Sequence, residues 1–461
     1  MNILAGYIMP HPPLAVEAVG KGSERGIPET MSAYHEIGRR ISEMKPETIV
    51  VISPHAPTYA DYFHISPGKA AAGDFGVFGE PGVKVTVNYD NELSTAISGI
   101  ADREGISAGL LGETPENSAL DHGVMVPLWF VNKYTDYAVV RVSTSGLPPE
   151  EHYKLGMCIK SAIGKLGRKT VIVASGDLSH KLKERGNKGE ECRAFDAKIT
   201  GIMRDARFEE LLMMGEDERY GAADCGSGAF MILAGILSGM LIKPEFLSYE
   251  GTFGVGYAQC AYHILSETGG DDYLALYKER MREAMAAAKD SESGLPRLAR
   301  NVVEAYVQTK RLPVKTALDQ EYRQTRAGVF VTIKKHGTLR GCIGTLEPTT
   351  ASIADEVRQN AVSACSRDFR FDPVEPGELP FLTYGVDVLS EPEPVDYTRL
   401  QEKLDPKTYG VIVTHGSKRG VLLPDLEGID TVSQQLEIAL KKAGISGELY
   451  NIERFKVTRH T

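Results

Sequence analysis

Four histidines lie directly after apolar segments or at the start of a helical one, where their side chains can converge on a metal ion. His11 is in the sequence PHPPL, His55 in SPHAP, His122 in DHGVMVPL and His180 in SGDLSH. Imidazole is the commonest metal-ligating group of proteins, and the prolines restrict the backbone around His11 and His55. A single histidine of this kind is more often a hydrogen-bonded loop residue. Four of the chain's eleven histidines in such places together predict a metal site.

A sulfur donor is also available at the start of an apolar helical segment. The sequence GAADCGSGAF at 221–230 contains Cys225, with Asp224 beside it. The N-terminal end of a helix stabilises a thiolate, and a thiolate favours zinc or copper over harder ions. The competing interpretation is that Cys225 is only a small buried residue.

The elements that must position these residues are short apolar strands separated by helices. Apolar runs predict buried strands at 2–9, 48–53, 137–144 and 170–175, and helical spacing occurs at 31–44, 122–134 and 150–167. This alternation predicts an α/β domain with a mostly parallel sheet and helices on both faces. Ligands bind beyond the carboxyl ends of such strands, which is where His11, His55 and His180 are placed.

The character of the sequence changes near residue 270. The segment 267–294 begins with acidic residues and glycines and continues as a charged, alanine-rich helix. Beyond it, β-rich segments are mixed with helices in an α+β pattern. We therefore predict an α/β domain over 1–268, a connecting helix over 269–284 and an α+β domain over 285–461.

The clearest motif of the second half is LRGCIGTLEP, which contains Cys342. Its glycines leave the backbone bare and the thiol reachable, and Arg340 and His336 are placed to favour a thiolate. Physical reasoning alone favours a structural role, because glycines in a strand mark a bulge or close backbone packing. Cys365, in SACSRDFRFDPV, is a weaker candidate for the same pocket.

The four histidine motifs, in this order over about residues 1–265, resemble the class III extradiol dioxygenases (LigB-like) and their Memo-like relatives. The resemblance implies an α/β fold that holds non-haem Fe(II). It assigns His11 and His55 as metal ligands, His180 as the catalytic acid/base and His122 as a further pocket histidine.

The third ligand departs from the dioxygenase pattern. The dioxygenases supply a glutamate. At the matching position this chain has Cys225, as Memo-like proteins do, so the resemblance implies Cys225 as the third ligand, with Asp224 as the alternative. Iron stays favoured, and zinc or copper stays open. Asp177, three residues before His180, is expected to orient that histidine. The favoured function is a metal-dependent oxidoreductase acting on a small aromatic or other small molecule. A zinc-type hydrolase and a non-catalytic protein that binds metal or a peptide are the alternatives.

The second half resembles the AMMECR family over about residues 285–461. Besides LRGCIGTLEP, the matching segments are SACSRDFRFDPV, VDVLSEPEPV, YGVIV and KRGVLLPDLEGIDT. The family implies an α+β fold with a small pocket, for which Cys342, Arg340 and Cys365 are our candidates. The fusion resembles the AmmeMemoRadiSam arrangement, which implies a radical SAM protein as a separate partner, because this chain has no CxxxCxxC motif.

Composition narrows the classes of partner and compartment. A net charge of -10 repels phosphate backbones, so we expect no nucleic-acid partner. The longest uncharged apolar stretch, 226–242, is shorter than the roughly 20 residues that span a bilayer, so we expect no membrane insertion. No signal-peptide pattern begins the chain, and six scattered cysteines without a CxxC pair fit a reducing cytoplasm.

Overall fold

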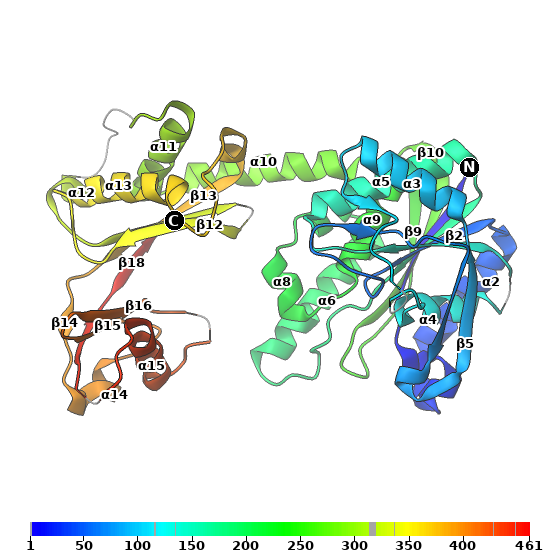
Figure 1. The fold of residues 1–461 in the computed structure, drawn as a ribbon, viewed down its shortest axis with the longest axis horizontal. Helices are drawn as coiled ribbons and strands as arrows, with labels where there is room; N and C mark the ends of the chain where they lie inside the picture. The colour runs from blue at the N-terminus through cyan, green and yellow to red at the C-terminus, as the bar shows by residue number, and fades with distance from the viewer. Residues whose placement is uncertain are drawn as a thin grey trace. The chain divides into compact units, whose positions relative to one another are not determined.

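The chain forms two compact units, Met1–Glu279 and Arg280–Thr461, in a computed structural model (Figure 1). The structure describes residues 2–114, 117–133, 135–312, 320–335, 337–426, 428–447 and 449–461. The boundary between the units falls within helix α10 (Tyr273–Ser291). Among the described residues, no helix is both long enough and apolar enough to cross a membrane.

The first unit is built on an eight-stranded sheet with the order β4-β5-β7-β2-β8-β1-β10-β9. The strands from β5 to β1 are parallel, and β4, β10 and β9 pair antiparallel at the two edges. Their bounds are β1 (Ile3–Met9), β2 (Thr48–Ser53), β4 (Ala70–Phe75), β5 (Glu80–Tyr89), β7 (Ala138–Ser143), β8 (Thr170–Ser175), β9 (Met240–Glu250) and β10 (Tyr257–Gly269). The predicted, mostly parallel α/β sheet is confirmed. A separate small pair joins β3 (Phe63–His64) and β6 (Ala108–Gly109).

Helices cover both faces of this sheet, because its strands are apolar on both sides. In β2, Val50 and Ile52 join the core on one face, whereas Ile49 and Val51 join the core on the other. The first face is covered by α3 (Asn91–Arg103), α5 (Pro149–Leu166), α6 (Asn187–Asp205), α7 (Phe208–Leu212) and α9 (Ser227–Leu237). The second face is covered by α2 (Pro28–Met44) and α4 (His122–Val131). The short helices α1 (Glu17–Gly20) and α8 (Glu216–Ala222) lie in connections.

Glycines bring α5 and α9 into close contact and so fix the helix that follows Cys225. A Cβ atom on Gly235 would lie 1.9 Å from the carbonyl oxygen of Tyr153, and one on Gly156 would lie 2.1 Å from that of Ile232. Any side chain at either position would therefore push the helices apart.

The second unit has two four-stranded sheets whose neighbouring strands are antiparallel, β12-β11-β13-β18 and β14-β17-β15-β16. The first comprises β11 (Val329–Lys335), β12 (Thr338–Thr345), β13 (Leu382–Leu389) and β18 (Val457–His460); the second comprises β14 (Glu393–Pro394), β15 (Gly410–His415), β16 (Lys418–Leu422) and β17 (Asn451–Phe455). Separate apolar cores join the first sheet to α11 (Gly294–Thr309) and α13 (Ile353–Ser366), and the second to α15 (Val432–Ala443). Two short helices, α12 (Gln320–Gln324) and α14 (Leu400–Lys403), complete the unit. The predicted α+β class of this half is confirmed.

Candidate metal centre

Three of the predicted ligands converge at the carboxyl ends of the central strands. His11 follows β1, His55 follows β2, and Cys225 lies two residues before α9. The neighbouring strands β2, β8 and β1 run parallel, so the segments after them meet at one edge of the sheet. One ligand atom from each of the three residues lies within 4.8 Å of the other two.

The spacing of these donor atoms fits a single bound ion. The Nε2 atoms of His11 and His55 are 3.1 Å apart, and the Sγ atom of Cys225 is 3.6 Å from Nε2 of His11. An ion with bonds of about 2.0 Å to nitrogen and about 2.3 Å to sulfur, at tetrahedral angles, would separate two nitrogens by about 3.3 Å and nitrogen from sulfur by about 3.5 Å. The observed separations are within a few tenths of an ångström of these values.

His11 is held as a neutral ligand with its Nε2 directed at the cluster. The side chain is 1% exposed, and its Nδ1 lies 2.9 Å from Oγ of Ser175 at the end of β8. Burial, followed by repulsion from the other three histidines of the site, lowers the pKa of His11 well below 6.5. A proton on Nδ1 bonded to Ser175 leaves the Nε2 lone pair free, which is the form that a metal requires.

His122 stacks on His55 and forms a wall beside the cluster. The ring centroids are 4.2 Å apart with an interplanar angle of 28°, and the Phe78 ring meets His122 edge-on at 5.5 Å. Burial and then the charge of His55 lower the pKa of His122 to about 4, so this ring is neutral near pH 7. His122 is thus placed to hydrogen-bond a ligand without bringing a positive charge to the metal.

The two candidates for the third ligand have different roles. The Asp224 carboxylate accepts the main-chain N–H groups of Gly226 and Ser227, both at 3.1 Å, and so caps α9. The Cys225 sulfur instead faces His11. Burial, with repulsion from Asp177 and Asp224, raises the pKa of the Cys225 thiol well above 9. Burial and the two acidic neighbours therefore outweigh the expected stabilisation of a Cys225 thiolate by the helix start. Helix α9 begins only two residues after Cys225.

The same acidic surroundings suit a cation. Burial, with a smaller contribution from Asp224, raises the pKa of Asp177 to about 7. Burial also raises the pKa of Asp224. Both carboxyl groups add to the raised pKa of the Cys225 thiol. Three groups that become anions thus lie beside histidines that stay neutral. A divalent ion would favour the ionised forms of all three, so the donor set and its charge both fit a metal.

His180 lies at the exposed rim of the cluster after β8. Its Nδ1 lies 3.0 Å from the carbonyl oxygen of Leu178. Because a carbonyl oxygen can only accept a hydrogen bond, Nδ1 carries the proton and the lone pair of Nε2 is left free. Its charge is near enough to lower the pKa values of His11 and His55. The expectation that Asp177 orients His180 is wrong: Asp177 accepts the main-chain N–H of His11 at 2.7 Å, and Leu178 orients the ring.

A cavity of about 390 Å³ opens on the side of His122. Phe78, Leu120 and Met125 give it apolar walls, and Lys84 supplies the one cation that lines it. Its size is within the range of small-molecule sites. The remaining lining residues are Ala72, Gly73, Asp74, Val77, Ala119, Asp121 and His122.

In the second unit, Cys342 lies inside the edge strand β12. Its Sγ is 3.3 Å from Oγ1 of Thr332 on β11, its N–H donates to Asp368 at 2.8 Å, and its carbonyl oxygen accepts from Arg370 at 3.1 Å. A Cβ atom on Gly341 would lie 2.3 Å from a main-chain oxygen of α13. The glycines of this motif therefore permit close backbone packing, as physical reasoning alone predicts.

The other two candidates for the C-terminal pocket, Arg340 and Cys365, have surroundings different from those of Cys342. Arg340 is bound to Glu378 through two hydrogen bonds, at 3.0 and 2.9 Å. Cys365 is buried in α13, where burial raises the pKa of its thiol to about 11. His336 lies outside the described residues. The three side chains have separate hydrogen-bond partners, and a shared pocket of Cys342, Arg340 and Cys365 stays a prediction.

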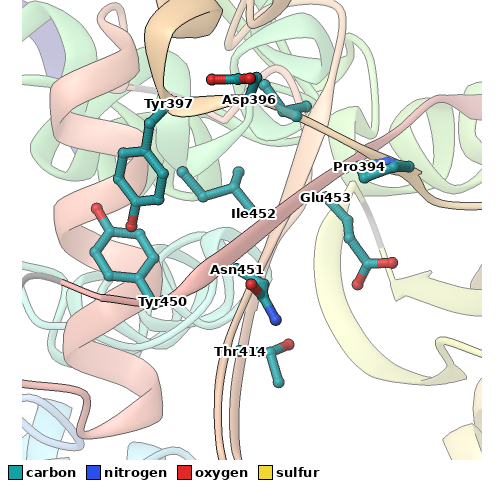
Figure 2. A pocket seen from close by; sticks show the side chains of 9 residues that line it. Pro394, Asp396, Tyr397, Thr414, Tyr450, Asn451, Ile452 and Glu453 are labelled. Carbon is teal, nitrogen blue, oxygen red and sulfur yellow. The ribbon is translucent and has the colours of Figure 1, made fainter.

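An open cavity of about 480 Å³ lies at a different place in this unit, beside β17 (Figure 2). The rings of Tyr397 and Tyr450 meet on one side of it, with centroids 5.2 Å apart. Its lining comprises Pro394, Val395, Asp396, Tyr397, Thr414, Tyr450, Asn451, Ile452 and Glu453. Of the motifs singled out in the sequence, VDVLSEPEPV contributes Pro394 and Val395 to this lining.

Several residues that support the metal centre are also missing from the sequence prediction. Ser175 bonds His11, and Ser53 accepts the main-chain N–H of His55 at 3.2 Å. Asp121 accepts from Ser53 at 2.6 Å. The available signal is that the predicted strands at 48–53 and 170–175 both end in serine, directly before the loops that carry the histidines.

Comparisons with known proteins match a family model to each of the two units. A family model described as "Catalytic LigB subunit of aromatic ring-opening dioxygenase" matches residues 5–259, and the AMMECR1 model matches residues 296–461. A protein of Clostridium acetobutylicum is 39% identical over 100% of this chain and 99% of its own length.

A relative that is named for an activity and a solved structure are also similar to parts of the chain. The beta subunit of a 2-aminophenol 1,6-dioxygenase from a Pseudomonas species is 26% identical over 57% of this chain and 95% of that protein. The crystal structure of an uncharacterised Pyrococcus horikoshii protein matches 36% of this chain and 88% of that one, at 28% identity and a TM-score of 0.33. With a family model over more than half of its length and a full-length relative, the chain belongs to the LigB family of catalytic subunits of aromatic ring-opening dioxygenases, here fused to an AMMECR1 domain.

Proposed function

We propose that the first unit is an extradiol-type oxidoreductase that holds Fe(II) with His11, His55 and Cys225. The observation that carries this proposal is the convergence of the three donor atoms at spacings that suit one ion. The LigB family and the similarity to a 2-aminophenol dioxygenase subunit support an aromatic substrate with an oxygen or nitrogen substituent. An ion bound there would supply Lewis acidity and a site for O₂.

The chain's own residues supply the remaining functions. The Nε2 atom of His180 is free because Nδ1 is held by Leu178, so His180 can take a proton from a substrate hydroxyl and return it later. The neutral ring of His122 and the edge of Phe78 form a wall against which an aromatic ring can pack. The cavity of about 390 Å³ that His122 and Phe78 line is large enough for a small aromatic molecule.

The test is metal content and oxygen uptake of the full chain purified without oxygen. Protein reloaded with Fe(II) is expected to consume O₂ with catechol or 2-aminophenol and to form a ring-opened product that absorbs visible light. His180→Ala should keep the iron and lose the uptake. Iron-loaded protein that consumes no O₂ with a panel of catechols and aminophenols would refute the oxidoreductase.

A zinc-dependent hydrolase is the second candidate, and one observation favours it. Cys225 takes the place of the family's carboxylate, and thiolates favour zinc over iron. A zinc ion with three protein donors leaves a fourth position for water, as in hydrolytic zinc enzymes. This function would be favoured if zinc co-purifies in a one-to-one ratio and the zinc form hydrolyses model esters or amides. The iron form should then show no O₂ uptake.

For the second unit we propose a supporting role in a complex with a radical SAM protein. This chain has no cysteine motif for an iron–sulfur cluster, so radical chemistry would need that partner. Co-purification of a tagged full chain from its own host, analysed by mass spectrometry, tests the proposal. Absence of any radical SAM protein from the purified complex would count against it.

A further inference from the structure

Serines end three adjacent parallel strands of the first unit, and two of them bond the metal ligands. Ser143 ends β7, Ser53 ends β2 and Ser175 ends β8, in the spatial order β7-β2-β8. Ser53 and Ser143 are direct partners in the sheet, and all three side chains are fully buried. Ser175 fixes the tautomer of His11. Ser53 supports the other histidine through its main chain.

Ser53 links the loop of His55 to the start of α4. Its Oγ accepts the main-chain N–H of His55 at 3.2 Å and donates to Oδ1 of Asp121 at 2.6 Å. Asp121 also accepts the N–H of Val124 at 3.2 Å and so caps α4. One carboxylate therefore holds both the His55 loop and the helix that begins with His122.

A buried guanidinium lies near this carboxylate. Arg141 of β7 is fully buried, and its Nη1 is 3.7 Å from Oδ2 of Asp121. Its other donors bond Ser66 at 2.6 Å, the carbonyl oxygen of Ala119 at 2.8 Å and Glu113 at 3.1 Å. A buried charge is costly unless it is paired, and the carboxylate that pairs with Arg141 directly is Glu113. Oδ2 of Asp121 has no hydrogen-bond partner among the described residues. Asp121 begins the motif DHGVMVPL, whereas no motif marks Arg141.

We propose that Asp121 is a positioning residue that acts through Ser53 to hold His55 for metal binding. The inference rests on the proposed metal centre. His55 needs such support because, unlike His11, it lies in an exposed loop, and a metal site tolerates little positional error in its ligands. The stacking of His122 on the His55 ring adds a second contact from the same helix start.

The test measures Zn²⁺ affinity of the full chain by competition with a chromophoric chelator, together with the visible spectrum of the Co²⁺ form. Ser53→Ala should weaken Zn²⁺ binding by about 10-fold or more, as loss of such supporting bonds typically does, and should shift the Co²⁺ bands. Ser143→Ala is the matched control, since its hydroxyl accepts a main-chain N–H at 2.8 Å but serves His64. The Zn²⁺ affinity of this control should stay within about twofold of the wild-type affinity.

Asp121→Asn supplies a second measurement and remains available if Ser53→Ala does not fold. Asparagine keeps the helix cap but offers the Ser53 hydroxyl a neutral amide oxygen in place of the carboxylate, which is a weaker acceptor, so Zn²⁺ binding should weaken severalfold. The double variant should bind Zn²⁺ no more weakly than Ser53→Ala alone, because both changes act on the one hydrogen bond between Ser53 and Asp121. Unchanged affinity in either single variant, or losses that multiply, would overturn the inference. Wild-type protein that binds neither ion would instead refute the metal centre itself.

Discussion

Asp196 of α6 is a buried carboxyl group beneath the loop that carries His180, and it makes the stability of the first unit depend on pH. It accepts the main-chain N–H of Ser179 at 2.9 Å and the hydroxyl of Tyr249 at 2.7 Å. Burial raises its pKa from 3.8 to about 6, although both hydrogen bonds oppose the shift. Asp196→Asn removes the titrating group and keeps the bonds, because the amide oxygen accepts from Ser179 and the amide NH₂ donates to Tyr249.

The magnitude follows from the two pKa values. One pH unit of pKa shift corresponds to about 1.36 kcal/mol, so the protonated form of Asp196 is favoured on folding by about 3 kcal/mol. The pKa in the folded state is raised, so this stabilisation is complete below the unfolded value of 3.8 and is lost as pH rises through about 6. The free energy of unfolding of Asp196→Asn should therefore equal that of the wild type near pH 3.5 and exceed it by about 3 kcal/mol above about pH 7.

Urea unfolding of the full chain between about pH 3.5 and pH 8 measures this difference. Trp129, the only tryptophan, lies on α4, so its fluorescence reports the first unit. Asp205→Asn, at the exposed end of the same helix, is the control and should stay within about 0.5 kcal/mol of the wild type. The reasoning would be refuted if the difference in unfolding free energy between Asp196→Asn and the wild type were the same at every pH.

Three further outcomes are expected. His11→Ala should remove most bound metal, because it deletes one of three donors, whereas His180→Ala should retain it; elemental analysis of both variants decides. Cys342 should react with iodoacetamide faster than Cys260, whose thiol is fully buried with a pKa raised to about 12, and mass spectrometry of briefly labelled native protein measures this. A fragment of residues 1–279 should unfold cooperatively by calorimetry, and an insoluble fragment would show that the unit does not fold alone.

The fold was predictable where local pattern and tertiary environment agree. The strands β1, β2, β7 and β8 are buried on both faces, so their sequences are mostly apolar, with Arg141 of β7 as the charged exception. The antiparallel edge was not predictable in the same way. The apolar stretch 226–242 indicates one helix, but α9 ends at Leu237 and the chain turns at Gly239, whose φ of 71° suits glycine, into β9. Half-exposed β9 contains lysine and proline and lacks a strong strand pattern.

The site was predictable only as far as residue types and strand ends reveal it. The positions of His11, His55 and Cys225 follow from the parallel strands and the family resemblance. Their hydrogen-bond partners do not, because these contacts join residues far apart in the chain, such as Ser53 with Asp121. Cys342 shows the opposite case: its motif resembles a reactive site, but the structure uses its glycines for packing.

The charges around the three donors explain why they are suited to a cation and not merely to a buried polar cluster. The pKa of Cys225 is raised by burial and then by Asp177 and Asp224, while that of His11 is lowered mainly by burial. Without a cation the thiol keeps its proton and the imidazole is neutral. A divalent ion needs a neutral imidazole and a thiolate, so only the sulfur must lose a proton, and that loss accompanies binding. The thiolate then sets the preference among metals, which is why metal content separates the oxidoreductase from the hydrolase.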